Sequence, residues 1–388
     1  MPLAEGDPDD LACWLRLALT PGVGPVAART LLEAFGLPNA VFESGGGLLD
    51  DIAGPKLAAA LRHRDPERER RIARALDWAR ADDHHLVTMA DADYPPQLLR
   101  TADAPPLLYA VGVREVLARP AVAVVGSRNP TAGGLANARA FARALSEAGW
   151  TVASGLALGI DGAAHEGALA GGAGTVAVLG TGADLVYPAR HRNLAARIAA
   201  DGVVLSELPL GTEPSPGQFP RRNRLIAGMS HGVLVVEAAL QSGSLITARQ
   251  AADIGREVFA IPGSIHSPLA RGAHALIRQG AVLVESVDDV LAELPAVEHP
   301  LDPATRPMAA SSGAGAHAPP AVLTERIELP DGDPILAALG HEPVPPDLLA
   351  EHLAMPAGEL GARLVVLELA GRLQRLPDGR VVRPPPIG

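Results

Sequence analysis

Nine short apolar runs, with helical stretches between most of them, constrain the fold of this chain more than any other feature. Several runs, such as residues 121–125 and 233–236, are rich in Val and lack polar alternation, which is typical of strands buried on both faces. Helical patterns such as residues 135–148 and 160–170 separate them. This alternation predicts an α/β fold with an open, doubly wound, mostly parallel sheet. The expected strands are residues 86–89, 107–111, 121–125, 151–153, 175–179, 203–205, 233–236, 258–261 and 282–284.

The flanking regions have other patterns, so we expect further units on both sides of the sheet. Residues 1–82 are predicted to form a helical domain, with a tight turn at Thr20-Pro21-Gly22-Val23-Gly24-Pro25. Such a turn presents backbone N–H groups to phosphate in helix-hairpin-helix or SAM-like modules, but it also joins helices in ordinary bundles. The sheet is expected in residues 83–295. Residues 296–325, rich in Pro, Ala, Ser and Gly, predict a flexible linker.

The last segment, residues 326–388, predicts a winged helix. Its expected elements are helices at residues 335–339, 348–353 and 357–373, then a two-stranded wing at 373–376 and 381–382 that turns at Asp378-Gly379. The third helix would read DNA in a DNA-binding winged helix. Here it carries acidic and basic side chains together: Glu359, Glu368, Arg363 and Arg372. A role in protein contacts is therefore at least as reasonable as a role in DNA contacts.

Composition places the chain among soluble globular proteins, since 48% of its residues are hydrophobic and 20% are charged. Cys13 is the only cysteine, which excludes an intrachain disulfide and indicates a reducing compartment. We find no signal peptide and no membrane-spanning run, so we expect a cytoplasmic protein without membrane contact. The net charge of -11 argues at first against a nucleic-acid partner. Residues 85–295, however, hold 16 basic and 18 acidic residues, so most of the acidic excess lies in the flanks.

Four of the expected strands end in turns of the same chemistry. Ligands of doubly wound sheets bind at the carboxyl ends of the strands. Each turn combines Gly, which lets the backbone approach a ligand, with hydroxyl groups near a helix N-terminus, an arrangement that binds phosphate oxygens. The sequence therefore predicts an anionic ligand. The residues concerned are Gly126, Ser127 and Arg128; Ser154, Gly155 and Gly159; Ser242, Gly243, Ser244 and Thr247; and Pro262, Gly263 and Ser264.

A further segment, predicted as a loop, places three guanidinium groups beside an aromatic ring. It reads Phe219, Pro220, Arg221, Arg222, Asn223 and Arg224. Guanidinium forks bind phosphate bidentately, and an aromatic face stacks a base, so this pairing suits a single-stranded nucleic acid. A run of charges can equally be a solvated surface. The neighbouring Gly/Ser turns favour the nucleic-acid interpretation.

Other ligand classes lack their signatures. The run from Gly126 to Gly134 does not fit G-x-G-x-x-G, and no acidic residue closes the next strand at the ribose position. The chain has neither a G-x-x-x-x-G-K-[ST] phosphate loop nor a G-x-S-x-G nucleophile elbow. We therefore expect no cofactor and no catalytic residue.

Two pairs of titratable residues leave alternatives open. Asp161 and His165 are four residues apart and would share a helix face, where they could ligate a metal. They could instead complement the helix N-terminus and bond within the fold, and we expect no metal site. Glu207 and Glu237 both follow expected strands and could serve glycosyl hydrolysis, or could hold Arg side chains and backbone donors.

Taken together, the motifs closely resemble the DNA-processing protein A (DprA, or Smf) family. The similarity is dense from about residue 86 to residue 293, and the flanking helical and winged-helix units also fit members that carry them. The motifs that carry the resemblance are Tyr94-Pro95-Pro96-Gln97-Leu98-Leu99, Val124-Val125-Gly126-Ser127-Arg128, Ser154-Gly155-Leu156-Ala157 with Gly159-Ile160-Asp161 and Ala164-His165, Phe219-Pro220-Arg221-Arg222-Asn223-Arg224, and Ser242-Gly243-Ser244-Leu245-Ile246-Thr247.

The resemblance implies a non-enzymatic protein that binds single-stranded DNA through an extended Rossmann-like domain and forms a homodimer. It also implies that the protein loads the RecA recombinase onto incoming DNA during natural transformation. It implies that Arg222 and Arg224 pair with the DNA backbone and that Phe219 stacks a base. The phosphate-gripping residues that it implies are Gly126, Ser127, Arg128, Ser154, Gly155, Ser242, Gly243 and Ser244.

The alternative is a Rossmann-like enzyme that hydrolyses nucleotides, of the nucleoside-monophosphate ribohydrolase type. Such enzymes resemble this chain around residues 242–247, but their Gly-Gly-x-Gly-Thr-x-x-Glu run is missing, since Ala248, Arg249 and Gln250 follow Thr247. A purely structural dimer scaffold is a third hypothesis, and it leaves the arginine-rich segment unexplained.

Overall fold

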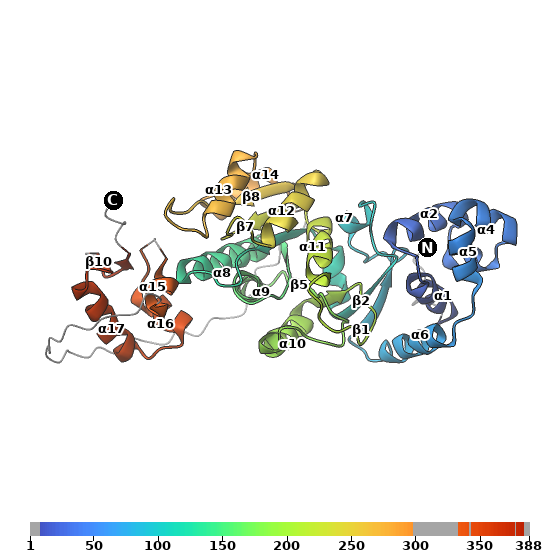
Figure 1. Ribbon diagram of the computed structural model, residues 1–388, viewed down its shortest axis with the longest axis horizontal. Helices are drawn as coiled ribbons and strands as arrows, with labels where there is room; N and C mark the ends of the chain where they lie inside the picture. The colour runs from blue at the N-terminus through green and yellow to red at the C-terminus, as the bar shows by residue number, and fades with distance from the viewer. Residues whose placement is uncertain (1–7, 298–332, 341–342, 377, 384–388) are drawn as a thin grey trace.

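The structure is a computed structural model that describes residues 8–297, 333–340, 343–376 and 378–383. Three units follow one another along its long axis: an N-terminal helical unit, a central sheet with helices on both faces, and a C-terminal winged helix (Figure 1). Most of the linker expected at residues 296–325, and the start of the C-terminal unit at residues 326–332, lie outside the described residues. The expected domain boundaries stay predictions.

The N-terminal unit consists of short helices that mostly begin with Pro at the first position, where the missing N–H has no intrahelical partner to lose. A core of apolar side chains, including Leu17, Leu31 and Leu61, holds them together. The buried guanidinium of Arg68 donates to Thr20 Oγ1 at 3.0 Å and so fixes the turn between the first two helices. The helices are α1 (Pro8–Leu19), α2 (Pro25–Phe35), α3 (Pro38–Glu43), α4 (Gly46–Ala53), α5 (Pro55–Arg62) and α6 (Pro66–Trp78).

The central sheet contains all nine expected strands, in the order β1-β2-β6-β5-β4-β3-β7-β8-β9. The pairs from β6 to β9 along this order are parallel, whereas β1 with β2 and β2 with β6 are antiparallel. This confirms the mostly parallel α/β sheet. The strands are β1 (His84–Thr88), β2 (Leu107–Gly112), β3 (Ala121–Val125), β4 (Thr151–Ser154), β5 (Thr175–Val178), β6 (Val203–Ser206), β7 (Gly232–Val235), β8 (Glu257–Ala260) and β9 (Val282–Leu283).

Helices cover both faces of the sheet, and each face has its own apolar core. One core lies under α8, α9 and α14, and the other lies under α11, α12 and α13. The helices of this unit are α7 (Pro96–Leu99), α8 (Ala132–Glu147), α9 (Ile160–Gly171), α10 (Arg192–Asp201), α11 (Gln218–Met229), α12 (Ser244–Asp253), α13 (Arg271–Arg278) and α14 (Val287–Glu293), with 3₁₀ turns η1 (Arg114–Ala118) and η2 (Ala189–His191). No helix in the described part of the chain is long and apolar enough to span a membrane.

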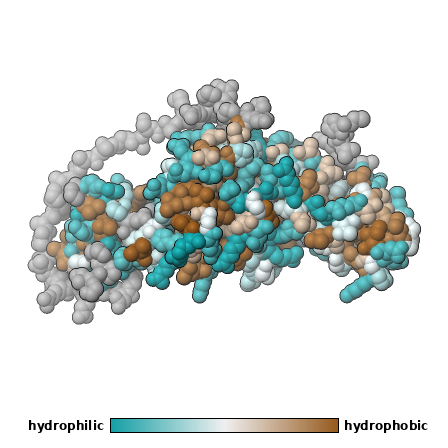
Figure 2. Space-filling view, turned by 90° about the horizontal axis from the view of Figure 1, so that it is seen from above, coloured by the Kyte–Doolittle hydropathy of each residue, from teal (hydrophilic) through white to brown (hydrophobic). Residues whose placement is uncertain are grey.

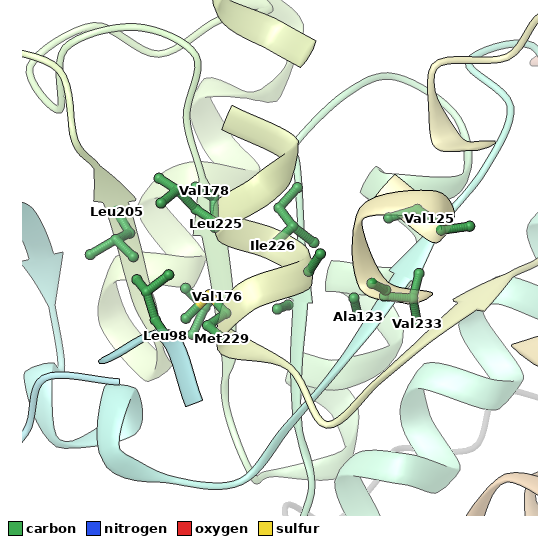
Figure 3. Close-up of a cluster of buried hydrophobic side chains, with 14 of the residues drawn as sticks. Leu98, Ala123, Val125, Val176, Val178, Leu205, Leu225, Ile226, Met229 and Val233 are labelled. Atoms are coloured by element: carbon green, nitrogen blue, oxygen red, sulfur yellow. The ribbon is translucent and has the colours of Figure 1, made fainter. Parts of the chain in front are cut away.

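The arginine-rich segment is helical, so its prediction as a loop was wrong. It forms the first turns of α11. Pro220 misled the prediction, but a proline in the first turn costs no intrahelical hydrogen bond. The segment also continues into a helical apolar face, since Leu225, Ile226 and Met229 are buried against β3 and β5 (Figure 3). This packing explains why the arginines before it point in fixed directions.

The C-terminal unit has the expected order of winged-helix elements and packs on α8. Ala132 of α8 belongs to the apolar core of this unit, and Arg139 of α8 lies 3.3 Å from Glu351. The third helix ends at Leu369, four residues before the expected Leu373, and Gly371 then turns the chain with a positive φ of 68°. The elements are α15 (Pro334–Leu339), α16 (Pro346–Leu353), α17 (Ala357–Leu369), β10 (Gln374–Arg375) and β11 (Val381–Val382).

Candidate functional site

A cleft of about 690 Å³ lies where the strand order of the sheet reverses. The chain runs outward from β3 to β4, β5 and β6 on one side, and continues with β7, β8 and β9 on the other. At such a point the loops after neighbouring strands diverge and leave a crevice for a ligand. We call it the main cleft. Ten of the residues predicted from the sequence line it: Gly126, Ser127, Arg128, Phe219, Arg222, Asn223, Ser242, Gly243, Ser244 and Thr247.

The loop after β3 is held rigidly and leaves Arg128 exposed. Ser127 donates its backbone N–H to the carbonyl of Glu237 at 2.7 Å, and its hydroxyl accepts from the N–H of Asn129 at 3.1 Å. The Glu237 carboxylate accepts from the N–H and the hydroxyl of Thr131 at 2.9 and 2.7 Å. Glu237 therefore holds backbone and side-chain donors, as one of the alternatives for this residue predicted. The Arg128 guanidinium is exposed at the end of this hydrogen-bonded loop.

The backbone N–H groups of the loop after β4 already bind a side chain of the protein, the carboxyl group of Asp161. Asp161 Oδ2 accepts from the N–H groups of Gly155 and Ala157 at 3.1 and 3.3 Å. The hydroxyl of Ser154 is fully buried and donates to the carbonyl of Val124 at 2.7 Å. Burial raises the pKa of Asp161, and the charge of Arg222 opposes this shift. Ser154 and Gly155 thus serve the fold at the positions where the sequence predicted phosphate contacts.

Arg222 is only 5% exposed, and its guanidinium faces the protein. It donates to the carbonyl of Gly155 at 2.6 Å and to the carbonyl of Val178. Burial lowers the pKa of Arg222 to about 10, which still leaves it charged at neutral pH. A Cβ on Gly155 would lie 2.5 Å from this guanidinium, so the glycine is needed for the close approach. Arg222 therefore joins α11 to the ends of β4 and β5, and its predicted pairing with the DNA backbone would require these bonds to break.

The other two arginines of α11, Arg221 and Arg224, do not lie where their predicted contacts with DNA would place them. Arg224 pairs with Glu207 and donates to the carbonyl of Asp103 at 2.8 Å, which leaves its side chain 14% exposed. Burial raises the pKa of Glu207, and the charge of Arg224 opposes the shift. Glu207 thus holds an arginine, as predicted in one of its two alternatives. Arg221 is exposed, and neither it nor Arg224 lines the main cleft.

The first turn of α12 provides the hydroxyl groups of the main cleft. The hydroxyls of Ser242 and Ser244 lie 2.7 Å apart, and Asn223 of α11 donates to the carbonyl of Gly243 at 3.3 Å. Thr247 follows one turn later and is buried at the cleft wall. The N–H of Ser244 lies 3.4 Å from Ser242 Oγ, and the N–H groups of Leu245 and Ile246 donate to the carbonyls of Ser242 and Gly243 at 3.1 Å each. The two serine hydroxyls are therefore the groups that this turn offers to an anion.

An aromatic pair lies beside Arg128. The ring centroids of Phe219 and Tyr187 are 5.5 Å apart, and the Arg128 guanidinium lies 5.8 Å from the Phe219 ring centroid. Tyr187 is 47% exposed and was missed by the sequence analysis. Its signal was available, because it follows the strand that ends near residue 178 and is an aromatic residue in a polar turn. The pair offers π-faces of the kind on which bases stack.

The pair Asp161 and His165 forms part of the fold. His165 is fully buried, and its Nδ1 lies 2.8 Å from the hydroxyl of Thr175. That hydroxyl donates to the carbonyl of Val152 at 2.6 Å, so His165 Nδ1 carries the proton in this bond. Burial lowers the pKa of His165 to about 3. Within the described ranges, no group of three or more His, Cys, Asp or Glu side chains is placed to hold a metal ion.

Of the remaining predicted residues, Gly159 lies at the entry of α9 and lines a neighbouring cleft of about 500 Å³. Pro262, Gly263 and Ser264 line a separate small cavity of about 30 Å³ and do not join the main cleft. The main cleft thus combines an exposed guanidinium, an aromatic pair and two serine hydroxyls at the start of α12, at the switch point of the sheet. These features define an α/β protein whose switch point is equipped for an anionic ligand that also has rings to stack.

Comparison with known proteins places the chain in a family. Residues 85–295 match the family "DNA recombination-mediator protein A", and residues 317–379 match the "DprA winged helix domain". The chain therefore belongs to the DprA/Smf family.

Individual relatives agree with this placement. The protein Smf of Escherichia coli (strain K12) is 42% identical over 311 residues, which cover 80% of each chain. The protein Smf of Synechocystis is 35% identical over 398 residues, covering 96% of this chain and 98% of the relative. The X-ray structure of DNA processing protein A from Streptococcus pneumoniae superposes with a TM-score of 0.63 at 39% identity, covering 73% of this chain and 96% of that chain.

Proposed function

We propose that this protein binds single-stranded DNA in the main cleft and acts without catalysing a reaction. One observation carries the proposal: Arg128, exposed on a hydrogen-bonded loop, lies 5.8 Å from the ring of Phe219, which pairs with Tyr187, and lines the same cleft as Ser242 and Ser244. Arginine and hydroxyl groups bind phosphate, while aromatic rings bind unpaired bases. Bases in a duplex are stacked on each other, so this combination favours a single strand.

The carboxylates support a binding role. Among the described residues that line the main cleft, Asp161 carries the only carboxylate, and it accepts hydrogen bonds from two backbone N–H groups. Glycosyl hydrolysis uses a pair of carboxylates that flank the scissile bond. Glu207 and Glu237 hold Arg224 and Thr131 outside the lining. The alternative of a nucleotide-hydrolysing enzyme therefore lacks its acid–base pair in this cleft.

The salt dependence of binding tests the proposal. For single strands, log K falls against log salt concentration with a slope of about −0.7 for each phosphate neutralised. We expect Arg128→Ala to weaken oligo-dT binding and to reduce this slope by about 0.7, because it removes one phosphate contact. Arg197→Ala is the matched control, since Arg197 is an exposed arginine of α10 outside the cleft. Equal affinities and slopes for Arg128→Ala and wild type would reject the site.

The partners belong to the same proposal and rest on the family. We infer a homodimer that loads the RecA recombinase onto incoming DNA in natural transformation, inside the cytoplasm. In support of a dimer, hydrophobic side chains gather over the central unit in the view of Figure 2. Large apolar side chains are exposed near the β9 edge of the sheet, including Ile265 at 75% and Leu283 at 46%. Sedimentation equilibrium of wild type and Leu283→Arg tests this part, with dissociation expected for the variant.

A further inference from the structure

The neighbouring cleft of about 500 Å³ lies between the central unit and the winged helix. We call it the side cleft. One wall consists of residues 128–130 together with parts of α8, α9 and η2. The opposite wall consists of α15 and α16 of the winged helix, which lie beside α8 in Figure 1. The side cleft is thus formed jointly by two units far apart in the sequence.

The two clefts are connected through Arg128, which lines both of them. A smaller cavity of about 80 Å³ bridges the two, because it shares Phe219 and Tyr187 with the main cleft and Leu158 with the side cleft. Arg128 lines this cavity as well. A chain molecule that meets Arg128 in the main cleft therefore has a continuous surface to follow into the side cleft.

The side cleft has cations at its rim and an apolar floor. Arg128 and Arg190 are both exposed. Its carboxylate, Glu166, is paired with Arg139 at 3.0 Å, and the same arginine reaches Glu351 of the winged helix at 3.3 Å. Apolar and small side chains make up the floor and the far wall, including Leu158, Ala163, Pro334, Ala337 and Leu353. Cations beside an apolar surface suit a ligand with alternating phosphates and bases.

The winged helix is held at this place by packing as well as by charge. Ala132 of α8 is buried in the apolar core of the winged helix, and a Cβ on Gly340 would lie 2.7 Å from Thr131 Cγ2. Its third helix, α17, packs on α16, whereas α15 and α16 are the helices that contact α8. The wall toward the side cleft is therefore not the helix that reads duplex DNA in winged helices.

We propose that the side cleft is a second section of the single-strand site, with the winged helix as its outer wall. The inference rests on the proposed function of the main cleft. A strand bound in the main cleft continues past Arg128, places a phosphate at Arg190, and packs its bases against the apolar residues of α9 and α15. A short strand that fills only the main cleft does not reach this section.

Oligonucleotides of two lengths separate the two sections. We compare oligo-dT of about six and about twenty nucleotides, since a groove site covers about 4–16 nucleotides. Arg190→Ala is expected to weaken binding of the long strand about three- to ten-fold and to leave the short strand unchanged, because it removes one charge-assisted contact. Arg197→Ala is the control with the same change in net charge. Equal losses for both arginine variants would overturn the proposal, as would a loss that is the same for both lengths.

A second variant tests the wall contributed by the winged helix. Ala337 is exposed on α15, so Ala337→Glu is expected to fold and to place a negative charge in the side cleft. It should weaken the long strand at least three-fold, while Val365→Glu, at an exposed position on α17, should not. Long-strand affinity unchanged by Ala337→Glu would overturn the role of the winged helix. Failure of the wild type to bind either length would instead reject the proposed function itself.

Discussion

Arg222 gives the sharpest test of the site geometry, because its guanidinium is hydrogen-bonded inside the protein whereas the sequence predicted that it pairs with the DNA backbone. Replacing it with Ala leaves the carbonyls of Gly155 and Val178 without their donor. A hydrogen bond from a charged group contributes about 1.5–3 kcal/mol, so two give an upper value of about 3–6 kcal/mol. Water entering through the adjoining 80 Å³ cavity recovers part of this, and we expect the free energy of unfolding to fall by about 3 kcal/mol.

Urea denaturation of the full chain, followed by the fluorescence of its tryptophans, measures this loss. The control is Arg221→Ala, which removes an exposed arginine from the same helix and should change the free energy of unfolding by at most about 0.5 kcal/mol. Below the unfolding transition, Arg222→Ala should bind oligo-dT with the same salt slope as wild type, since the guanidinium faces the protein. An unchanged urea midpoint together with a slope reduced by about 0.7 would show that Arg222 contacts phosphate and would refute the reasoning.

Three further predictions follow from the same contacts. Phe219→Ala should weaken single-strand binding by about 1–3 kcal/mol in a fluorescence titration, and no loss would make Phe219 a packing residue only. His165 has a folded pKa of about 3, below its unfolded value, so it contributes stability above about pH 6.5 that is lost as the pH falls toward 3. Its share should be about 1.4 kcal/mol per pH unit, which His165→Gln should remove from the pH dependence of unfolding. Asp161→Asn keeps an oxygen acceptor for both loop N–H groups and removes a negative charge from the main cleft. It should bind oligo-dT at least as tightly as wild type, and a ten-fold loss would contradict this view of Asp161.

The sheet could be predicted because its strands depend on local composition. Runs such as residues 121–125 and 233–236 are apolar at each position, and both faces of the sheet are covered. The helix at residues 219–224 could not be predicted, because it does not depend on local composition. Its polar residues carry no apolar period of their own, and its helical state is stabilised by the packing of Leu225, Ile226 and Met229 further along the chain.

Ten residues of the main cleft could be named from the sequence, but the direction of each side chain could not. Arg128 and Arg222 are the same residue type, and both were predicted to lie in loops that bind phosphate. One is exposed on a loop, whereas the other is buried because two carbonyls meet at the ends of β4 and β5. The burial of Arg222 thus depends on hydrogen bonds to two residues that lie 67 and 44 positions away along the chain. Tyr187 was missed because it lies nine residues beyond the end of β5, and only the fold brings it beside Phe219.

The occupied loop after β4 bears on the kind of ligand that the main cleft selects. A mononucleotide enzyme would need a tight phosphate cradle, yet the N–H groups of Gly155 and Ala157 already bind the carboxylate of Asp161. The contacts left for a ligand are spread over Arg128, the hydroxyls of Ser242 and Ser244, and the aromatic pair. Each contributes about 0.5–3 kcal/mol, which is too little for tight binding of one nucleotide after its loss of free motion. A strand that spans all of these contacts loses its translational and rotational freedom only once, and it gains the summed free energy of the contacts. Its affinity should therefore rise steeply with strand length.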